Sequence, residues 1–286
     1  MQTLSIGDLD DPRLADYRNL KDATLARDRG RFIVEGAGTL RVLLSRSPHR
    51  PESILLSERA HASMGEELDA LDPSCPVFVG AQAILDRIVG FPIHRGVLAS
   101  CVRSEPVDPL ELARSVQKQF EAPRIVVLEG LMNLDNVGLV FRNAMALGAR
   151  AILLCPRTCD PLYRKAIRTS MGGSLCVPFA RADDLARLLA ALRRSDWKVL
   201  AFDPAPDAVD LRDLDESRLG PTALLFGTEG AGLSESALAA SDRRVRIAME
   251  QGVDSLNVAV AAGIALSALR SGDPVGGDAT ESARIR

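Results

Sequence analysis

The stretch IAMEQGVDSLNVAVAAGIAL, residues 247–266, joins two segments of opposite character. Residues 250–255 are mostly polar and include a glycine, whereas residues 256–266 carry a single polar side chain, that of Asn257. A helix on a protein surface normally keeps a polar face, and a helix that is apolar on every side is normally buried. The stretch therefore predicts a deeply buried helix that follows directly on a polar loop.

The composition is that of an ordinary globular protein. The chain has 286 residues, of which 47% are hydrophobic and 26% charged, and its length predicts two domains at about 100–200 residues each. No apolar run approaches the ~18 residues of a membrane span, and the N-terminus does not resemble a secretory signal, so the cytoplasm is expected. The net charge of −3 gives no global signal for nucleic acid but is compatible with a local basic face.

The cysteines and histidines predict neither a disulfide framework nor a metal site. The five cysteines are odd in number and widely spaced, and Cys155 and Cys159 lack the spacing of a CxxC pair. The three histidines do not cluster with them. We therefore expect no metal, and we interpret the cysteines as buried apolar residues.

Residues 1–103 alternate between short apolar runs and segments of helical period, which predicts a small α/β domain. The expected strands are residues 31–36, 52–57, 76–80 and 96–103, and the expected helices are residues 38–46, 58–71 and 81–90. The segment SEPVDPLE, residues 104–111, contains two prolines and three acids and predicts a linker or a leading helix. Residues 104–122 are therefore expected to form the domain boundary.

A second series of strands and helices fills residues 123–271. The expected strands are residues 124–131, 151–155, 197–202, 222–227 and 243–249, and the expected helices are residues 137–149, residues 184–195 and the apolar segment after Ser255. The tail, residues 272–286, has no apolar period and is expected to be disordered.

Polar or glycine-rich loops follow three strands of this second domain, at the sheet edge where ligands bind in open α/β folds. The first loop holds Asn133, Asp135 and Asn136, the second holds Gly227, Glu229, Gly230, Gly232 and Ser234, and the third is residues 250–257. Glycines allow close approach of a ligand, and Ser or Asn at a helix start caps free N–H groups. Each loop alone is equally well explained as a good turn, whereas three such loops together indicate a binding site.

The familiar nucleotide-binding signatures are absent from the sequence. No GxGxxG follows the first strand of either domain, and no GxxxxGK[ST] occurs, which argues against dinucleotide and P-loop sites. The second loop carries the acid Glu229, which disfavours a polyphosphate and favours a ligand with positive charge or hydroxyl groups.

In order and spacing, NVGLVFRNAMALGA, FGTEGAGLSE and the opening stretch resemble the three motifs of the SpoU/TrmH family of RNA ribose 2′-O-methyltransferases, of the SPOUT class. The resemblance covers residues 124–270 and implies an α/β fold: a C-terminal knotted parallel-sheet methyltransferase domain, residues 123–271. In that fold the last helix passes through a loop of the chain as a trefoil knot, a feature otherwise nearly absent from proteins. Residues 1–103 resemble, more loosely, the small ribosomal-protein-like α/β domain that many members place before the catalytic one.

The resemblance also implies which residues bind the cofactor and the substrate. The polar loop would wrap S-adenosylmethionine in a bent shape, with Gly227, Ile247, Met249 and Leu256 at the cofactor. The residues implied on the substrate side are Arg142 at the ribose 2′-hydroxyl, Asn136 holding Arg142 or the substrate, Glu229 fixing a neighbouring side chain or the ribose, and Ser255 and Asn257 lining the pocket or capping a helix. Family members are homodimers, so Arg142 is expected to act on RNA that the partner chain helps to bind.

Arg142 is expected to orient the acceptor rather than to act as a simple base. Methyl transfer from a sulfonium needs an aligned oxygen nucleophile and a group that takes or stabilises its proton. The pKa of arginine exceeds about 12, so a free arginine is a poor base. We favour orientation and electrostatic stabilisation of the alkoxide, and the alternative is loss of the Arg142 proton in a phosphate-bound setting.

The chain departs from the family pattern at two positions. Ala248 stands where proline is usual, which removes the fixed φ of that residue but leaves the backbone groups in place. Asn143 stands where threonine is common, next to Arg142. We expect both changes to affect supporting contacts rather than the chemistry.

RNA binding is expected through a basic face of the first domain. Among its basic residues we single out Arg18, Lys21 and Arg29, and acids are interleaved with them, so an ordinary solvated surface explains the pattern nearly as well. Aromatic residues make up only 4% of the chain, which favours reading of structured RNA by shape and backbone over base stacking.

The sequence thus predicts an S-adenosylmethionine-dependent methyltransferase that acts on the ribose 2′-hydroxyl of RNA, preferably ribosomal RNA because of the N-terminal domain. The alternatives are a tRNA 2′-O-methyltransferase, a non-catalytic RNA-binding or ribosome-assembly factor of the same fold, and a generic α/β enzyme for a small metabolite. The complete set of polar motif residues argues against the non-catalytic alternative, and the three ordered motifs argue against the metabolite enzyme.

Overall fold

The computed structural model describes the chain except for residues 1, 19–20, 70, 92, 94–95 and 271–286. Its contacts divide the chain into two compact units. Unit 1 comprises residues 1–105 and 160–176, and unit 2 comprises residues 106–159 and 177–286. The tail expected to be disordered, residues 272–286, lies outside the described residues.

Unit 1 is built on a five-stranded mixed sheet of order β1-β4-β3-β5-β2. Its strands are β1 Gln2–Ser5, β2 Arg31–Glu35, β3 Pro51–Ser57, β4 Pro76–Gly80 and β5 Val97–Val102. Strands β1, β4 and β3 are parallel, whereas β5 runs antiparallel to both β3 and β2. Four of these strands were predicted from their apolar runs, and β1 was not.

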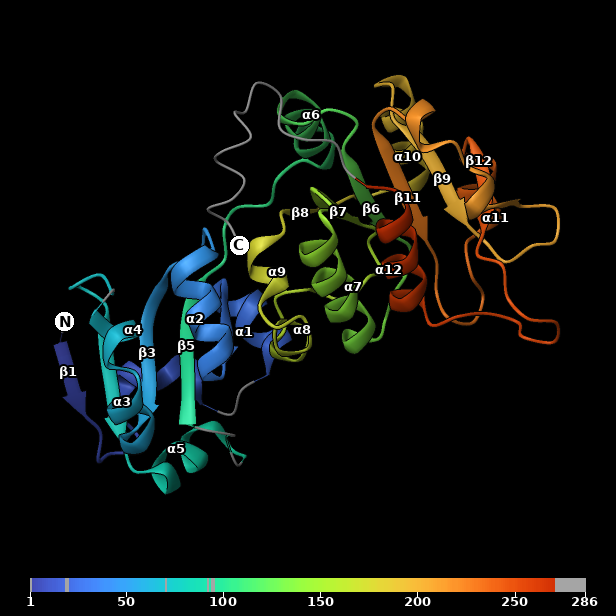
Figure 1. The fold of residues 1–286 in the computed structure, drawn as a ribbon. Helices are drawn as coiled ribbons and strands as arrows, with labels where there is room; N and C mark the ends of the chain where they lie inside the picture. The colour runs from blue at the N-terminus through green and yellow to red at the C-terminus, as the bar shows by residue number, and fades with distance from the viewer. Residues whose placement is uncertain (1, 19–20, 70, 92, 94–95, 271–286) are drawn as a thin grey trace. The chain divides into compact units, whose positions relative to one another are not determined.

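The helices of unit 1 are short and surround this sheet (Figure 1). They are η1 Pro12–Tyr17, α1 Asp22–Arg29, α2 Ala37–Arg46, α3 Glu58–Ser63, α4 Gly65–Asp69, α5 Gln82–Val89, α8 Arg164–Thr169 and α9 Gly173–Cys176. The single helix expected over residues 58–71 is divided at Met64, because a glycine of low helix propensity follows there.

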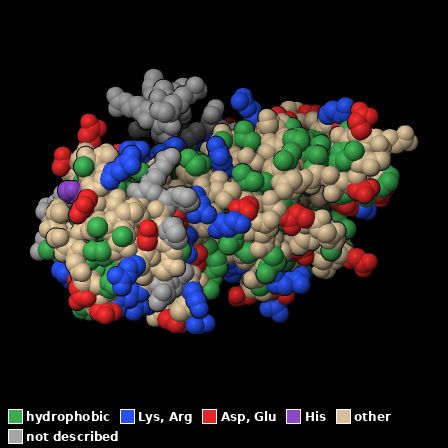
Figure 2. Space-filling model, turned by 90° about the horizontal axis from the view of Figure 1, so that it is seen from below, with side chains coloured by type: hydrophobic (Ala, Val, Ile, Leu, Met, Phe, Trp, Pro, Cys, Tyr) green, Lys and Arg blue, Asp and Glu red, His purple; other side chains and the backbone are tan. Residues whose placement is uncertain are grey.

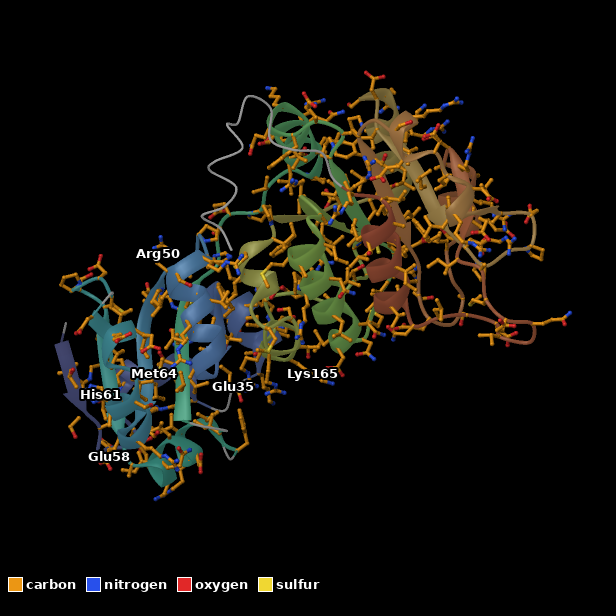
Figure 3. The ribbon with its side chains drawn as sticks, viewed as in Figure 1. Glu35, Arg50, Glu58, His61, Met64 and Lys165 are labelled. Atoms are coloured by element: carbon orange, nitrogen blue, oxygen red, sulfur yellow. The ribbon has the colours of Figure 1, made fainter. Side chains whose placement is uncertain are left out.

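Residues 160–176 lie in the second half of the sequence but pack within unit 1. The buried carboxylate of Glu35, on β2, is approached by Arg164 at 3.7 Å and by Arg168 at 3.3 Å, both from α8. Arg164 also pairs with Asp22 of α1 at 2.9 Å. Figure 3 labels Glu35 and Lys165, which mark β2 and α8. These ion pairs fix α8 on unit 1, whereas the sequence predicts these residues as part of the second domain, residues 123–271.

Unit 2 is built on a seven-stranded sheet of order β10-β12-β9-β11-β6-β7-β8, in which every recorded strand pair is parallel. Its strands are β6 Arg124–Leu128, β7 Ala151–Leu154, β8 Phe179–Arg181, β9 Lys198–Phe202, β10 Val209–Asp210, β11 Thr222–Phe226 and β12 Arg243–Arg246. The central strands β6 and β11 are buried along their whole length, as parallel strands covered on both faces require.

Helices cover both faces of this parallel sheet. The elements are α6 Pro109–Gln119, α7 Leu134–Leu147, α10 Leu185–Arg194, η3 Leu211–Asp213, η4 Glu216–Arg218, α11 Glu235–Ala239 and α12 Val258–Ala268. One core lies under α7 and α12, and the other lies under α6, α10 and α11. Helix α6 occupies most of the region expected to be a linker or a leading helix, residues 104–122, and packs against α10.

Helix α12 is less buried than its sequence suggested. Its buried face carries Val258, Ala259, Ala262, Ala265 and Leu266. The expectation of burial on every side is wrong for the isolated chain, because α12 packs mainly against α7 and β11 and leaves Val260 50% and Ile264 38% exposed. These two residues are one helical turn apart and form an exposed apolar stripe.

The cysteines are free thiols, as expected. Cys75, Cys101 and Cys155 are buried, and Cys159 and Cys176 are partly buried. Burial raises the pKa of the Cys75 thiol to about 11 and also raises that of Cys101. Both thiols therefore stay protonated near neutral pH and behave as small apolar side chains.

Within the described residues, we find no helix that is both long and apolar enough to cross a membrane.

Truncation of Phe141 tests the core under α7. Its ring is fully buried and meets Phe179 edge to face at a centroid distance of 5.8 Å. We expect Phe141→Ala to lower the free energy of unfolding of unit 2 by about 3–5 kcal/mol. Urea unfolding followed by the fluorescence of Trp197, the chain's only tryptophan and buried in unit 2, measures this loss.

Val107→Ala is the matched control, because Val107 is 48% exposed in the same unit and its loss should change stability by less than about 0.5 kcal/mol. Equal effects of the two substitutions would contradict the core assigned to α7.

Candidate functional site

A cavity of about 320 Å³ opens at the carboxyl ends of β9, β11 and β12 in unit 2. The loop after β11 contributes residues 227–232, and the segment after β12 contributes Ile247, Met249 and residues 254–256. Val258 and Ala261 of α12 also line the cavity. The cavity therefore lies where an open parallel sheet binds its ligands.

All four residues implied at the cofactor line this cavity. They are Gly227, Ile247, Met249 and Leu256. Ser255 and Glu229, implied on the substrate side, line it as well. Ala248 lies in the chain between the lining residues Ile247 and Met249 but does not itself line the cavity.

Position 227 has to be a glycine, because the backbone at Gly232 passes very close to it. The loop after β11 folds back as a hairpin in which the N–H groups of Thr228 and Gly232 each donate to the other's carbonyl at 3.1 Å. A Cβ atom on Gly227 would lie 2.3 Å from the carbonyl oxygen of Gly232, which is backbone and cannot turn aside. Any side chain at this position would therefore displace the hairpin that forms one wall of the cavity.

The amide of Asn136 connects the three motifs. Its Nδ2 donates to the carboxylate of Glu229, and its Oδ1 accepts a hydrogen bond of 2.9 Å from Nδ2 of Asn257. Asn136 lies in the first turn of α7 and is buried, whereas Glu229 and Asn257 are exposed. One buried amide thus holds the loops after β6, β11 and β12 together beside the cavity.

Two of these loops end in side-chain caps. Asn257 is the N-cap of α12, and its Oδ1 accepts from the N–H groups of Ala259 at 2.9 Å and Val260 at 3.3 Å. Asn133 caps α7 in the same way by accepting from Asp135 at 2.9 Å. Asn257 therefore caps a helix and joins the Asn136 network, and it does not line the cavity.

Arg142 stands apart from this network. It is exposed on α7 and does not line the cavity, and no contact between Arg142 and Asn136 is recorded among the described residues. Its neighbour Asn143 faces α12 instead and donates to the carbonyl of Ala259 at 2.6 Å. The asparagine that replaces the usual threonine thus adds a direct link between α7 and α12.

A further segment, which the sequence analysis does not single out, lines the cavity together with the loops after β11 and β12. Phe202, Asp203 and Pro204, at the end of β9, line the cavity, and Phe202 stacks on Phe226 at a centroid distance of 4.7 Å. Asp203 is held by Arg244 of β12 at 2.9 Å. The rule that located the other loops would have found this one, because it also follows directly on a predicted strand.

The three basic residues expected to bind RNA lie at the surface of unit 1. Arg29 pairs with Asp16 at 2.8 Å, and Arg18 donates to the carbonyl of Asp11 at 2.8 Å. Lys21 is exposed at the start of α1. Figure 2 shows Lys and Arg side chains interspersed with Asp and Glu on the face that it draws.

The residues that the structure describes contain no group of three or more His, Cys, Asp or Glu side chains placed to hold a metal ion.

The sequence pattern of the SpoU rRNA methylase family matches residues 123–267. A tRNA/rRNA methyltransferase of Mycobacterium tuberculosis, named as uncharacterized, is 38% identical over 281 residues, which cover 94% of this chain and 92% of the relative. The 23S rRNA (guanosine-2′-O-)-methyltransferase RlmB of Pseudomonas putida is 30% identical over 82% of this chain and 93% of its own length.

Solved structures show the same fold. An AdoMet-bound rRNA methyltransferase from Sinorhizobium meliloti superposes with a TM-score of 0.77 at 24% identity, over 94% of this chain and 98% of that chain. The SpoU methyltransferase AviRb from Streptomyces viridochromogenes, in complex with AdoMet, gives a TM-score of 0.76 at 22% identity, over 91% and 97% of the two chains. From its sequence relatives and its parallel-sheet unit, the chain belongs to the SpoU family of RNA methyltransferases.

Proposed function

We propose that this protein transfers a methyl group from S-adenosylmethionine to a ribose 2′-hydroxyl of RNA, preferably ribosomal RNA. The observation that carries the proposal is the junction of Asn136, Glu229 and Asn257 beside the cavity. It brings the three motif loops to one place and leaves a polar surface at the cavity mouth. The ribose specificity has further support from the RlmB relative, whose name states that reaction.

The cavity suits S-adenosylmethionine in charge and shape. Three carboxylates line it, those of Asp203, Glu229 and Asp254, whereas no Lys or Arg side chain of the described residues does. A sulfonium cation and an α-ammonium group are favoured by such a lining, and a polyphosphate is not. The stacked rings of Phe202 and Phe226 supply an apolar wall for the adenine. When bound, S-adenosylmethionine supplies the methyl group.

The residues of the chain would orient the acceptor and exclude water. Asn136 is fixed by two hydrogen bonds and in turn fixes Glu229 at the cavity mouth. Arg142 is exposed and outside the cavity, so we propose that it serves a site completed by a second protomer or by the bound RNA. There its positive charge would stabilise the developing alkoxide of the 2′-hydroxyl.

We propose that the functional form is a homodimer. The stripe of Val260 and Ile264 on α12 is apolar and exposed in the single chain. Exposed apolar patches on otherwise polar surfaces commonly mark protein interfaces. Helix α12 packs against α7, which carries Arg142, so a partner docked on α12 would be near that residue.

We propose that unit 1 is the ribosomal-protein-like RNA-recognition domain, with Arg18, Lys21 and Arg29 as phosphate contacts. Lys21 is exposed and could contact a phosphate directly. Arg29 is paired with Asp16, so it would have to leave Asp16 or bind Asp16 and a phosphate together. The free cysteines support a reducing compartment, the cytoplasm, for the protein.

We also propose that residues 247–268 thread the chain as a trefoil knot, as the motif order implies. The contacts of α12 with α7, β11 and η3, elements from widely separated parts of unit 2, support this path.

Methyl transfer itself is tested with the purified protein and tritiated-methyl S-adenosylmethionine. Separate pools of total tRNA and unmodified ribosomal RNA are offered, and labelled RNA is digested to nucleosides. A ribose-methylated nucleoside from ribosomal RNA supports the proposal, and label in tRNA alone supports the tRNA enzyme. Cofactor binding without transfer to either pool would favour the non-catalytic assembly factor.

Removal of Arg142 should abolish transfer without affecting the cofactor. We expect Arg142→Ala to lower the rate of RNA methylation by about a hundredfold or more, as loss of an oxyanion-stabilising group does. Affinity for S-adenosylmethionine, measured by calorimetry, should be unchanged because Arg142 does not line the cavity. Arg194→Ala, an exposed arginine of α10 remote from the three motif loops, is the control. Transfer that survives the loss of Arg142 would rule out its proposed role.

Alanine at Gly227 should remove cofactor binding. The added Cβ would collide with the Gly232 carbonyl and displace the hairpin wall. Gly220→Ala is the control, because its Cβ would meet no atom of the described residues within 4 Å and Gly220 lies outside the cavity. Calorimetry should show normal affinity for S-adenosylmethionine in the control and none in Gly227→Ala. Normal binding by both variants would contradict the close approach at Gly227.

Substitutions of Asn257 separate its two contacts. Asp is as good an N-cap as Asn, so Asn257→Asp should keep the cap, and Asn257→Ala should be less stable than Asn257→Asp by about 1 kcal/mol. Both variants lose the donor to Asn136, and the aspartate also faces the Asn136 oxygen, so both should transfer methyl groups more slowly. Urea unfolding and the transfer assay measure the two effects. Full activity of Asn257→Asp would show that the Asn136 network is dispensable.

A further inference from the structure

A second cavity of about 320 Å³ lies at the same edge of the unit 2 sheet, between the loops after β6, β7 and β11. Glu129, Met132, Arg157 and Ser234 line it. The hairpin after β11 separates it from the first cavity, and Thr228, Ala231 and Gly232 line both. A ligand in the second cavity would therefore be a direct neighbour of the cofactor proposed for the first.

Glu129 gives this cavity a buried carboxylate with an unused oxygen. The residue is only 8% exposed. Its Oε2 accepts a hydrogen bond of 3.0 Å from the N–H of Ser234, and no hydrogen bond to Oε1 is recorded among the described residues. Glu129 lines the cavity, so Oε1 is the oxygen left to bind a ligand there. A carboxylate withdrawn from water in this way is stabilised by a ligand that brings N–H donors.

The wall around Glu129 is held by an extensive set of backbone contacts. Gly130, which adopts a left-handed φ of 70°, donates its N–H to the Cys155 sulfur at 2.9 Å. Arg181 of β8 donates to the carbonyls of Cys155 at 2.9 Å, Pro156 at 3.2 Å and Thr158 at 2.7 Å. The loop that carries Arg157 is thus fixed before any ligand binds. A preorganised site of this kind loses less entropy on binding than a flexible surface does.

The remaining lining residues complete a site with an apolar face and a cationic mouth. Met132 is 71% exposed, an unusual position for a large apolar side chain, and it can pack on a flat ring. Arg157 is exposed, and no ion pair or hydrogen bond of its side chain is recorded in the described part of the chain. These three features match the three parts of a nucleotide. Met132 can pack on the ring, Glu129 can accept hydrogen bonds from its N–H groups, and Arg157 can contact its phosphate.

We propose that this second cavity receives the base of the methylated nucleotide and that Glu129 selects guanine. Guanine has two adjacent donors on its Watson–Crick edge, N1–H and the N2 amino group. Oε1 of Glu129 can accept one of them, and Oε2 can accept the other through the lone pair that Ser234 does not use. Uracil places its single N3–H between two carbonyl oxygens, which the buried carboxylate would repel. Arg157 contacts the phosphate and carries no base preference. This inference rests on the proposed RNA methyl transfer, and it adds the identity of the acceptor base.

Binding of single nucleotides tests the pocket without any transfer reaction. Guanosine and uridine 5′-monophosphates are titrated into the protein saturated with S-adenosylhomocysteine, and affinities are measured by NMR. Wild type should prefer the guanosine nucleotide. Glu129→Gln should lose about tenfold or more of that affinity, because its amide oxygen can still accept from Ser234 while its NH₂ group now faces the guanine donors. Equal binding of the two nucleotides, or an unchanged affinity in Glu129→Gln, would overturn the proposal.

Three further variants separate recognition from folding and from general charge effects. Met132→Ala removes an exposed side chain, so the fold should persist while affinity for the guanosine nucleotide falls. Arg157→Ala should weaken both nucleotides alike. Glu111→Gln, an exposed carboxylate of α6, should change neither affinity. If Met132→Ala binds the guanosine nucleotide with wild-type affinity, the proposed packing of Met132 on the base is wrong.

The nucleoside released from labelled RNA distinguishes this proposal from the one on which it rests. 2′-O-Methylguanosine as the product supports both proposals. A different 2′-O-methylated nucleoside overturns the guanine pocket and leaves the methyltransferase proposal intact. If wild type labels no RNA, the proposed function fails, and the nucleotide titration alone then decides whether the second cavity binds guanine.

Discussion

The arrangement of the site depends on the side-chain amide of Asn136. An amide offers both donors and an acceptor, and this one donates to Glu229 while it accepts from Asn257. A carboxylate could not make the first bond to another carboxylate, and a hydroxyl would be too short to reach both neighbours from the first turn of α7. Because Asn136 is buried, loss of either partner would leave a polar group unsatisfied, which costs about 1–3 kcal/mol. The three loops are therefore held in one arrangement rather than several.

The hairpin after β11 extends this constraint to the sheet edge as a whole. The hairpin is narrow because Gly227 has no side chain. It forms the wall between the two cavities, since Thr228, Ala231 and Gly232 line both of them. Its base is tied to the neighbouring strand by Ser234, which donates to Glu129. Any shift of the hairpin on cofactor binding would therefore change the shape of both cavities.

Much of this architecture could be predicted from local sequence patterns. Apolar runs located the long strands of both units, and polar residues after strands located two of the loops that line the cavity and the loop after β6 that Asn136 joins to them. Short or non-local features could not be found in this way. Strand β8 has only three residues, and α8 packs on unit 1 through ion pairs of Arg164 and Arg168 with Glu35 that join distant parts of the sequence. Glu129 escaped notice because a single acid after a strand has no distinguishing pattern until burial reveals it.

The position of Arg142 follows from the geometry of α7. Asn136 and Asn143 are seven residues apart, close to two helical turns, so both face the α12 side and bond to residues around its N-terminus. Arg142 lies about 100° away around the helix axis and is therefore exposed. Among the described residues, the cavity is lined by three acids and by no arginine, which suits a cationic cofactor better than it suits an alkoxide. On the proposed function, a single chain would build the cofactor half of the site, and a molecule bound beside α7 would complete the cationic half. The apolar stripe on the adjoining helix α12 makes a second copy of the chain the strongest candidate.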